Sequence, residues 1–314
     1  MPPSIILSLP LNENMNYKDH LITARSENDE IKAIAITSKD LVDYKRSLQN
    51  LSPISTAAIG RLMSAALMMG HWLKNGSDTL TLEIAGDGEL SHISAISNNA
   101  GEVRSYVSNP SVILPPNQAG HLNVGGAIGK GHLIVIRDLG LKTPYISQID
   151  LQTGEIAEDL AYYFAQSEQT PSAIGLGVHF DKEKVVVNHA GGFLIQLMPN
   201  TSEETISILE NNLKNIPSVT KMLEENEDSP KAILEIVMKG LNPLFEEGKD
   251  VSWKCNCSYE RGLRVLSSLP SKDLQDLINE EKPVDLNCNF CGKSYSYDKS
   301  VLQKILAKRG TKHE

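Results

Sequence analysis

Four cysteines are the residues of this 314-residue chain with the most specific chemistry, and all four lie in its last quarter. Cys255 and Cys257 form a CxC pair, and Cys288 and Cys291 form a CxxC pair after thirty intervening residues. Two close pairs of thiolates are a common ligand set for structural zinc, because each pair binds as a chelating turn and Gly292 relieves the second turn. The spacing therefore predicts one tetrahedral Zn2+ site made by all four cysteines.

The single residue between Cys255 and Cys257 adds a redox property to this site. A disulfide between these two sulfur atoms would close a small, strained ring, and strained disulfides are more easily reduced again. Zinc holds the sulfurs as nucleophilic thiolates, and their oxidation to two local disulfides would remove all four ligands. Because the binding free energy of a structural zinc, of order 10 kcal/mol, is also folding free energy, its loss would unfold the surrounding module.

The residues around the cysteines are expected to form a small domain spanning 251–314. Helix caps are expected at Ser258, Ser271 and Asp298, and strand alternation at Tyr295 and Tyr297. So short a module has a small apolar core and usually needs a metal or a disulfide to hold it together. The segment has eleven Lys and Arg and eight acids. Zinc held by four thiolates would bring its charge to about +1, which is too little for a dedicated nucleic-acid finger.

Residues 201–250 are distinctly acidic and are predicted to form several short helices. This segment has eleven acids and five lysines, and it supplies most of the chain's net charge of -9. Thr201 and Glu204 are expected to form a capping box, Pro217 interrupts the first helix, and Pro230 begins another. Short helices are marginal alone and depend on packing. Two interpretations remain open, an ordinary helical subdomain and a docked segment that is ready to detach.

The first 200 residues are predicted to form an α/β domain, with helices over 55–74 and 154–171. Strands are expected at 17–36 (two), 79–84, 90–96, 102–107, 132–138, 145–151, 173–180, 184–187 and 193–197. One face of the first helix is expected to carry its buried side chains, Ala58, Leu62, Ala65, Ala66, Met69 and Trp72. The run 190–192 is expected to be a turn into the last strand.

Motifs of catalysis and phosphate binding are not found in this first domain. The glycines of residues 124–131 do not fit a Walker loop, because Val124 and Gly131 stand where the motif needs Gly and Ser or Thr. They do not fit GxGxxG either, so a turn between strands is expected. HExxH and GxSxG are absent, and no pair of carboxylates suggests acid/base catalysis. The sequence thus predicts a protein that is not an enzyme.

Bulk composition limits the partners and the location of the protein. The net charge of -9 and a pI near 5.5 argue against a nucleic-acid-binding surface, because nucleic-acid affinity depends on basic patches. The N-terminus has no signal-peptide pattern, and no apolar run approaches the roughly 18 residues of a membrane span. A cytoplasmic protein with no membrane partner is expected, with its thiols kept reduced. A zinc-ribbon protein acting on RNA, or an enzyme with a structural zinc, remain as alternatives.

Several motifs together resemble the heat-shock protein 33 family of redox-regulated holdase chaperones. They are WKCNCSYER, CNFCGKSY, GEIAEDLAYYFAQSEQTPSAIGLGV, AGGFLIQLMP and PISTAAIGRLMSAALMMGHWLK. The resemblance covers essentially the whole chain. It implies an α/β core at 1–200 that binds clients and dimerises, a metastable helical linker at 201–250, and a small C-terminal zinc domain at 251–314 that acts as the redox switch.

The resemblance also implies how the four cysteines would work. In the reduced protein Cys255, Cys257, Cys288 and Cys291 would bind one Zn2+, and the chaperone would be inactive. Under oxidants Cys255 would pair with Cys257 and Cys288 with Cys291, zinc would leave, and the linker would unfold. Hydrophobic surface would then bind unfolding client proteins without ATP, and a homodimer would form.

Overall fold

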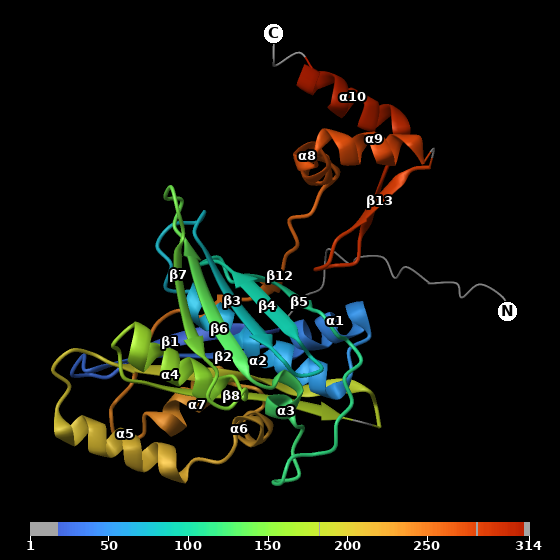
Figure 1. Cartoon of the computed structure of the whole chain (residues 1–314). Helices are drawn as coiled ribbons and strands as arrows, with labels where there is room; N and C mark the ends of the chain where they lie inside the picture. The colour runs from blue at the N-terminus through green and yellow to red at the C-terminus, as the bar shows by residue number, and fades with distance from the viewer. Residues whose placement is uncertain (1–17, 182, 281, 311–314) are drawn as a thin grey trace.

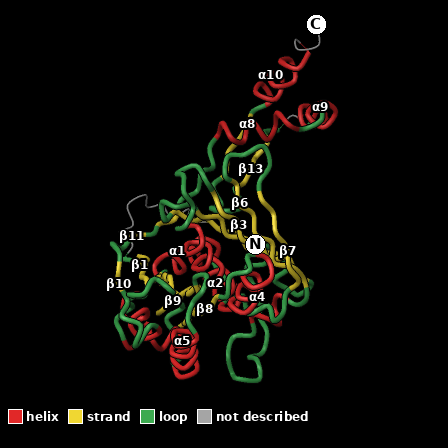
Figure 2. Tube along the Cα trace, turned by 90° about the vertical axis from the view of Figure 1, so that its left-hand side faces the viewer, coloured by secondary structure: helices red, strands yellow, loops and turns green. Residues whose placement is uncertain are grey.

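The computed structural model of the chain describes residues 18–181, 183–280 and 282–310. A large body contains two six-stranded sheets, and a small helical domain stands at one end of it (Figures 1 and 2). The prediction of a mixed α/β core is confirmed. The N-terminal stretch in which no signal peptide was expected, 1–17, lies outside the described residues. Among the helices that are described, none combines the length and the apolar character that a bilayer crossing requires.

The first sheet is antiparallel and draws its strands from distant parts of the chain. They are β1 (His20–Arg25), β2 (Ile31–Thr37), β8 (Ser172–Asp181), β9 (Val186–Leu197), β10 (Leu244–Phe245) and β11 (Lys249–Asp250). The order is β10-β1-β2-β9-β8, and β11 also pairs with β1. The outer edge of β1 is therefore closed by the chain segment that comes just before the cysteines.

The second sheet is built mainly from consecutive strands. They are β3 (Thr79–Gly86), β4 (His92–Ser97), β5 (Glu102–Val107), β6 (Gly131–Asp138), β7 (Tyr145–Asp150) and β12 (Ser252–Trp253). The order is β12-β5-β4-β3-β6-β7, and only β12 runs parallel to its neighbour. The predicted strands of this region are confirmed with small shifts of their ends, whereas β12 was not expected.

Helix α2 (Pro53–Gly70) lies between the two sheets and packs against strands of both (Figure 1). The Ser52 hydroxyl accepts from the backbone N–H of Ser55 at 3.2 Å and begins the helix, with proline at its first position. Every residue of α2 except Pro53 and Arg61 is buried. The helix was predicted correctly, but the single buried face was wrong, because a helix between two sheets has no side that faces water.

Three further helices complete the body: α1 (Lys39–Gln49), α3 (Val124–Ile128) and α4 (Ala157–Ser167). Helix α4 matches a predicted helix, whereas α1 was not predicted. Helix α3 replaces the turn expected at the glycines of 124–131. The side chain of Asn123 accepts from the N–H of Gly126, and Gly129, with φ of 75°, ends the helix. These glycines thus serve a short helix and its cap.

The turn expected at Ala190 to Gly192 is also wrong, because these residues lie inside the single long strand β9. Gly191 pairs with Thr37 of β2 and with Gly177 of β8. A Cβ atom on Gly191 would lie 2.2 Å from the carbonyl oxygen of Ile36. The glycine is therefore required by close backbone approach in the middle of a sheet.

Short helices after residue 200 cover the outer face of the first sheet (Figure 1). They are α5 (Glu203–Asn215), α6 (Val219–Glu225) and α7 (Pro230–Val237), and they confirm the predicted helical pattern. Ser229 caps α7 by accepting from Ala232 N. The capping box was wrong by one residue, because Ser202 caps α5 while the hydroxyl of Thr201 donates to the carbonyl of Glu30.

The small C-terminal domain has its own apolar core. Its elements are α8 (Tyr259–Ser268), α9 (Ser271–Asn279), β13 (Val284–Asn287), β14 (Ser294–Tyr297) and α10 (Lys299–Gly310). The core consists of Leu266, Leu274, Ile278, Tyr297 and Leu302. Ser258 caps α8 as predicted, but Pro270, and not Ser271, precedes α9 as its cap residue. Strand β13 was not predicted, and it pairs with the expected strand β14.

Candidate metal and redox centre

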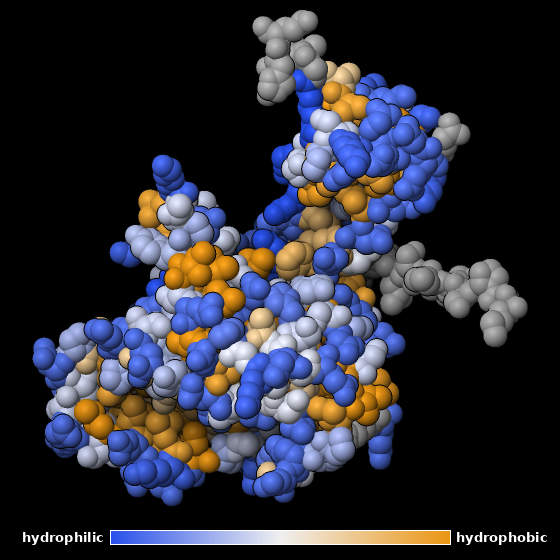
Figure 3. All heavy atoms as spheres, viewed as in Figure 1, coloured by the Kyte–Doolittle hydropathy of each residue, from blue (hydrophilic) through white to orange (hydrophobic). Residues whose placement is uncertain are grey.

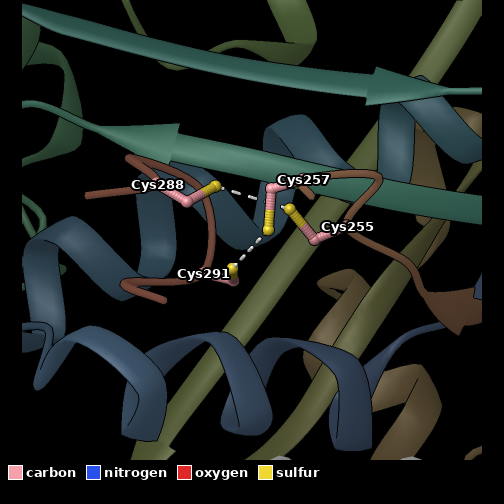
Figure 4. A group of neighbouring side chains, drawn as sticks. All are labelled: Cys255, Cys257, Cys288 and Cys291. Carbon is pink, nitrogen blue, oxygen red and sulfur yellow. Dashed lines mark hydrogen bonds between the residues drawn. The ribbon is translucent and has the colours of Figure 1, made fainter. Parts of the chain in front are cut away.

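The structure brings all four predicted cysteines together in one cluster (Figure 4). Their Sγ atoms lie within 4.8 Å of one another. The Sγ atoms of Cys255 and Cys288 are 3.5 Å apart, and those of Cys257 and Cys291 are 3.4 Å apart. Each short distance therefore joins one cysteine of the CxC pair to one of the CxxC pair.

The second pair lies on the turn that connects β13 to β14. Asn287 and Ser294 are the last paired residues of this hairpin. Inside the turn, the N–H of Gly292 donates to the carbonyl of Cys288 at 2.7 Å, and Gly292 has φ of 72°. A glycine adopts this left-handed conformation without strain, so the turn can place Cys288 and Cys291 side by side. We call residues 288–292 the second knuckle.

The first pair lies on the short link between the body and the C-terminal domain. On one side, the N–H of Lys254 donates to the carbonyl of Val103 at 2.9 Å, which continues the pairing of β12 with β5. On the other side, the Ser258 hydroxyl accepts from the N–H of Arg261 at 3.2 Å and begins α8. Cys255 and Cys257 are therefore fixed between a strand of one domain and a helix of the other.

The donor set fits a tetrahedral metal ion. Zinc–thiolate bonds of about 2.3 Å place neighbouring sulfur atoms about 3.8 Å apart in a tetrahedron. The observed sulfur distances bracket this value, and all four cysteines are free thiols. Four sulfur ligands and no carboxylate favour zinc over magnesium or calcium. The set could hold one Zn2+ with no open coordination position.

Hydrogen bonds adjust the acidity of the thiols. Hydrogen bonding from neighbouring thiols, above all that of Cys255, lowers the pKa of Cys291. Burial raises the pKa of Cys257, which is opposed by a hydrogen bond from the Tyr295 hydroxyl to its Sγ at 3.3 Å. Tyr295 was predicted only as a strand residue. Alternation could have indicated its position, because Tyr295 lies on the same face of β14 as Tyr297, which is buried in the domain core.

A lysine of the body also reaches this centre. Lys45 of α1 is fully buried, and its Nζ donates to the carbonyl of Ser105 at 2.7 Å and to that of Phe290 at 3.1 Å. Burial lowers the pKa of Lys45 to about 7, although the nearby cysteines favour its charged form. Sequence reasoning missed this residue, because α1 was not predicted and Lys45 lies far from the cysteines in the chain.

The chain is similar along nearly its whole length to one family of proteins. It matches the family model described as Hsp33 protein over residues 19–298. It is 41% identical over 92% of its length to the 33 kDa chaperonin of Desulforamulus reducens, covering 97% of that protein. It is also 42% identical to the 33 kDa chaperonin of Clostridioides difficile, and this similarity covers 92% of the chain and 99% of that protein.

A solved structure gives the same result. The fold is similar to the crystal structure of the 33 kDa chaperonin, or heat shock protein 33 homolog, of Thermotoga maritima, with a TM-score of 0.85 and 36% identity. The similarity covers 93% of this chain and 99% of the other. Since the family model and the relatives both span most of the sequence, the chain belongs to the Hsp33 family.

Proposed function

We propose that this protein is an ATP-independent chaperone that holds unfolding proteins, and that oxidation of its four cysteines activates it. The observation that carries the proposal is the position of the cysteine centre between the two domains. Only Lys254 separates Cys255 from strand β12 of the body sheet, so a change at the sulfur atoms would act on the body as well as on the C-terminal domain. The names of the relatives, 33 kDa chaperonin, support a chaperone function.

In the reduced protein, Cys255, Cys257, Cys288 and Cys291 would hold one zinc ion as thiolates. Bound zinc would supply folding free energy to a domain whose apolar core is small. Tyr295 would hold Cys257 through its hydroxyl group, and the pairing of β13 with β14 would keep the second knuckle in shape. In this state the chaperone would be inactive.

Oxidation would form two disulfides, Cys255 with Cys257 and Cys288 with Cys291. For each disulfide, two thiolates give up two electrons to one molecule of hydrogen peroxide, which takes up two protons from solvent and leaves as two molecules of water, while the loss of these ligands would release the zinc as Zn2+. A cleft beside the sulfur atoms, lined by Arg104, Cys255 and Cys288 among others, gives an oxidant access. The closest sulfur atoms belong to different pairs, so the centre must open before these disulfides form.

The linker would respond because it is held to the body mainly by apolar packing. Side chains of α6 and α7 are buried against the outer face of the first sheet, and Met222, Ile233 and Phe193 belong to this cluster. Some apolar surface is already visible among these helices at the lower left of Figure 3. If the linker detached, the sheet face and the helices would expose a larger apolar area, which suits the binding of unfolding proteins.

The remaining parts of the proposal follow the family. The segments 1–200, 201–250 and 251–314 would act as client-binding and dimerising core, metastable linker and redox-switch domain. The active form would be a homodimer, and the protein would work in the cytoplasm.

One experiment tests the central proposal. The purified, zinc-loaded protein is treated with hydrogen peroxide at mild heat, and zinc release, free thiols and the aggregation of an unfolding substrate protein are followed together. We expect loss of zinc and thiols to coincide with suppression of aggregation, and reduction with zinc to reverse both. Complete thiol oxidation without any suppression would contradict the proposal, and salt-dependent RNA binding by the reduced protein would favour the nucleic-acid alternative.

Replacement of a single ligand provides an independent check. Cys288→Ser leaves three thiolates, so zinc binding should weaken and aggregation should be partly suppressed even under reducing conditions. Ser296→Ala in the adjacent strand is the matched control. Undiminished zinc affinity in Cys288→Ser would exclude the four-ligand site.

A further inference from the structure

The second knuckle lies on a defined surface of the body. We call the four residues that form it, Lys45, Gln49, Arg104 and Trp253, the knuckle-receiving surface. They come from α1, β5 and β12, which are three neighbouring elements on one side of the body. Figure 4 shows the cysteine loops lying against the helices and strands of the body.

Recognition of the knuckle uses its backbone and one aromatic ring. The Nζ of Lys45 donates to the carbonyl of Phe290 at 3.1 Å. The side-chain amide of Gln49 donates to the carbonyl of Asn289 at 3.3 Å. The guanidinium of Arg104 lies 5.5 Å from the centre of the Phe290 ring. Two successive peptide carbonyls and one aromatic ring are features that many extended peptides can offer.

The same surface has unused hydrogen-bonding capacity. Within the described part of the chain, the buried Oε1 of Gln49 and the buried Nε1–H of Trp253 have no hydrogen-bond partner. A buried polar group without a partner is costly, and most such groups in folded proteins are satisfied. The N–H and C=O groups of a longer bound peptide could supply an acceptor and a donor here. The second knuckle is a tight turn, and it makes no hydrogen bond to Oε1 of Gln49 or to the Nε1–H of Trp253.

Removal of the knuckle would increase this unused capacity. The ammonium group of Lys45 would keep the carbonyl of Ser105 and the ring of Trp253, 5.1 Å away, but would lose one of its two acceptors. Arg104 would lose the ring that it covers. A partly desolvated lysine, arginine and tryptophan would then be open to another carbonyl-bearing, aromatic segment.

We propose that the knuckle-receiving surface is a binding site for an extended, aromatic-containing segment of an unfolded polypeptide, and that Phe290 occupies this site while the cysteine centre is intact. This inference rests on the proposed function, since oxidation is what would remove the knuckle. Client binding and knuckle docking are mutually exclusive at the site. Clients therefore favour the undocked form, just as undocking favours client binding.

The test uses the full-length oxidised protein and a fluorescent decapeptide with one central phenylalanine. Fluorescence anisotropy measures its affinity for the wild type and for Arg104→Gln. Loss of a cation–π contact should weaken binding by about 3- to 30-fold. Lys32→Gln is the matched control, because it removes a cation that lies 4.4 Å from the Trp72 ring, away from the knuckle. A decapeptide with alanine in place of phenylalanine should also bind more weakly.

A second variant tests the surface without oxidation. Phe290→Ala removes the aromatic ring of the second knuckle and leaves all four cysteines. The variant should still bind one zinc ion per chain, and measurement of the zinc content checks that the cysteine centre is intact. We expect the reduced variant to bind the phenylalanine peptide at least about 3-fold more tightly than the reduced wild type, because the cation–π contact no longer competes. Equal affinities of the two reduced proteins would overturn the inference.

Failure of this inference can be distinguished from failure of the proposed function. If oxidised wild type and oxidised Arg104→Gln bind the peptide equally while both suppress aggregation, the site is wrong and the chaperone function stands. If the oxidised wild type does not suppress aggregation, the proposed function itself fails. If Arg104→Gln instead abolishes a dimer of the oxidised protein and the dimer excludes the peptide, a second copy of the chain is the occupant and the inference is overturned.

Discussion

The Nδ1 of His189 lies 2.8 Å from Oδ1 of Asp228, and this contact joins strand β9 of the body to the turn between α6 and α7. The ammonium of Lys39 lies 3.8 Å from the other carboxylate oxygen of Asp228. One side chain of the linker thus contacts two basic residues of the body. Most of the neighbouring linker contacts are apolar. Asp228 is therefore a point where linker docking can be weakened without changing the apolar cluster.

Asp228→Ala should make the linker open more readily. Loss of the contacts of a partly buried carboxylate should cost about 1 kcal/mol, which is roughly a 5-fold increase in the open population. Hydrogen exchange across α5 to α7 measures this increase in the reduced protein. Glu210→Ala removes an exposed ion pair with Lys214 on the same segment and is the control. Identical exchange in both variants would show that Asp228 does not hold the linker.

Tyr295→Phe should weaken metal binding although all four ligands remain. The variant loses the hydrogen bond from the hydroxyl to the Sγ of Cys257 and keeps the ring. Loss of a hydrogen bond to a metal-ligating side chain typically lowers metal affinity by about 10- to 100-fold. Competition with a chromogenic zinc chelator measures the change. Tyr106→Phe, in strand β5 of the body, is the control, and an affinity equal to that of the wild type in both variants would contradict a role for Tyr295 in the centre.

Gly191→Ala should destabilise the body without touching the cysteines. The added methyl group would lie 2.2 Å from the carbonyl oxygen of Ile36, so strands β2 and β9 must move apart. Such overpacking costs about 1–3 kcal/mol in the free energy of unfolding. Urea denaturation followed by tryptophan fluorescence measures the loss. At Gly76 an added Cβ meets nothing within 4 Å, so Gly76→Ala should leave the denaturation midpoint nearly unchanged.

Asp19→Asn should change how stability depends on pH. Asp19 is 3% exposed, and its carboxylate accepts from the N–H of Leu41 at 2.8 Å. Burial raises its pKa from 3.8 to about 7. Between pH 3.8 and about pH 7, the folded protein keeps a proton on Asp19 that the unfolded chain has released, so raising the pH lowers the free energy of unfolding. This loss of stability is absent below the pKa of the unfolded chain and complete above the pKa of the folded protein.

The asparagine variant does not titrate at this position. Its free energy of unfolding minus that of the wild type should therefore increase as the pH is raised from 5 to 7, by at most about 1.4 kcal/mol per pH unit. Urea denaturation over this pH range measures the difference. Asp138→Asn, at an exposed position, is the control. A difference that does not vary with pH would show that Asp19 is ionised in the folded protein throughout.

Local sequence signals predicted most of the elements and the cysteine cluster. Strands of the second sheet were found because their alternation is set by neighbouring residues, and the ligand set was found because cysteine spacing is itself local. Glycine is ambiguous, because it marks both turns and close backbone contacts. Gly191 was assigned to a turn for this reason. The two-residue strand β12 is too short to show any periodicity.

The surroundings of the cysteine centre could not be predicted, because they depend on contacts between distant segments. Lys45 and Phe290 meet only in the folded chain. A lysine on an amphipathic helix is ordinarily a surface residue, and the sequence around Lys45 has no feature that marks it as buried. The all-round burial of α2 likewise depends on two sheets whose strands come from many parts of the chain.

The pairing of β1 with β10 and β11 has a consequence for synthesis on the ribosome. Arg25 pairs with Leu244, and His20 pairs with Asp250. Among the described residues, β1 is the first strand to leave the ribosome, and its outer edge cannot be closed until β10 and β11 have been synthesised. During this interval the nascent chain presents an open strand edge, which is a site of aggregation. The outer edge of β1 can therefore be closed only when the residues just before Cys255 have emerged.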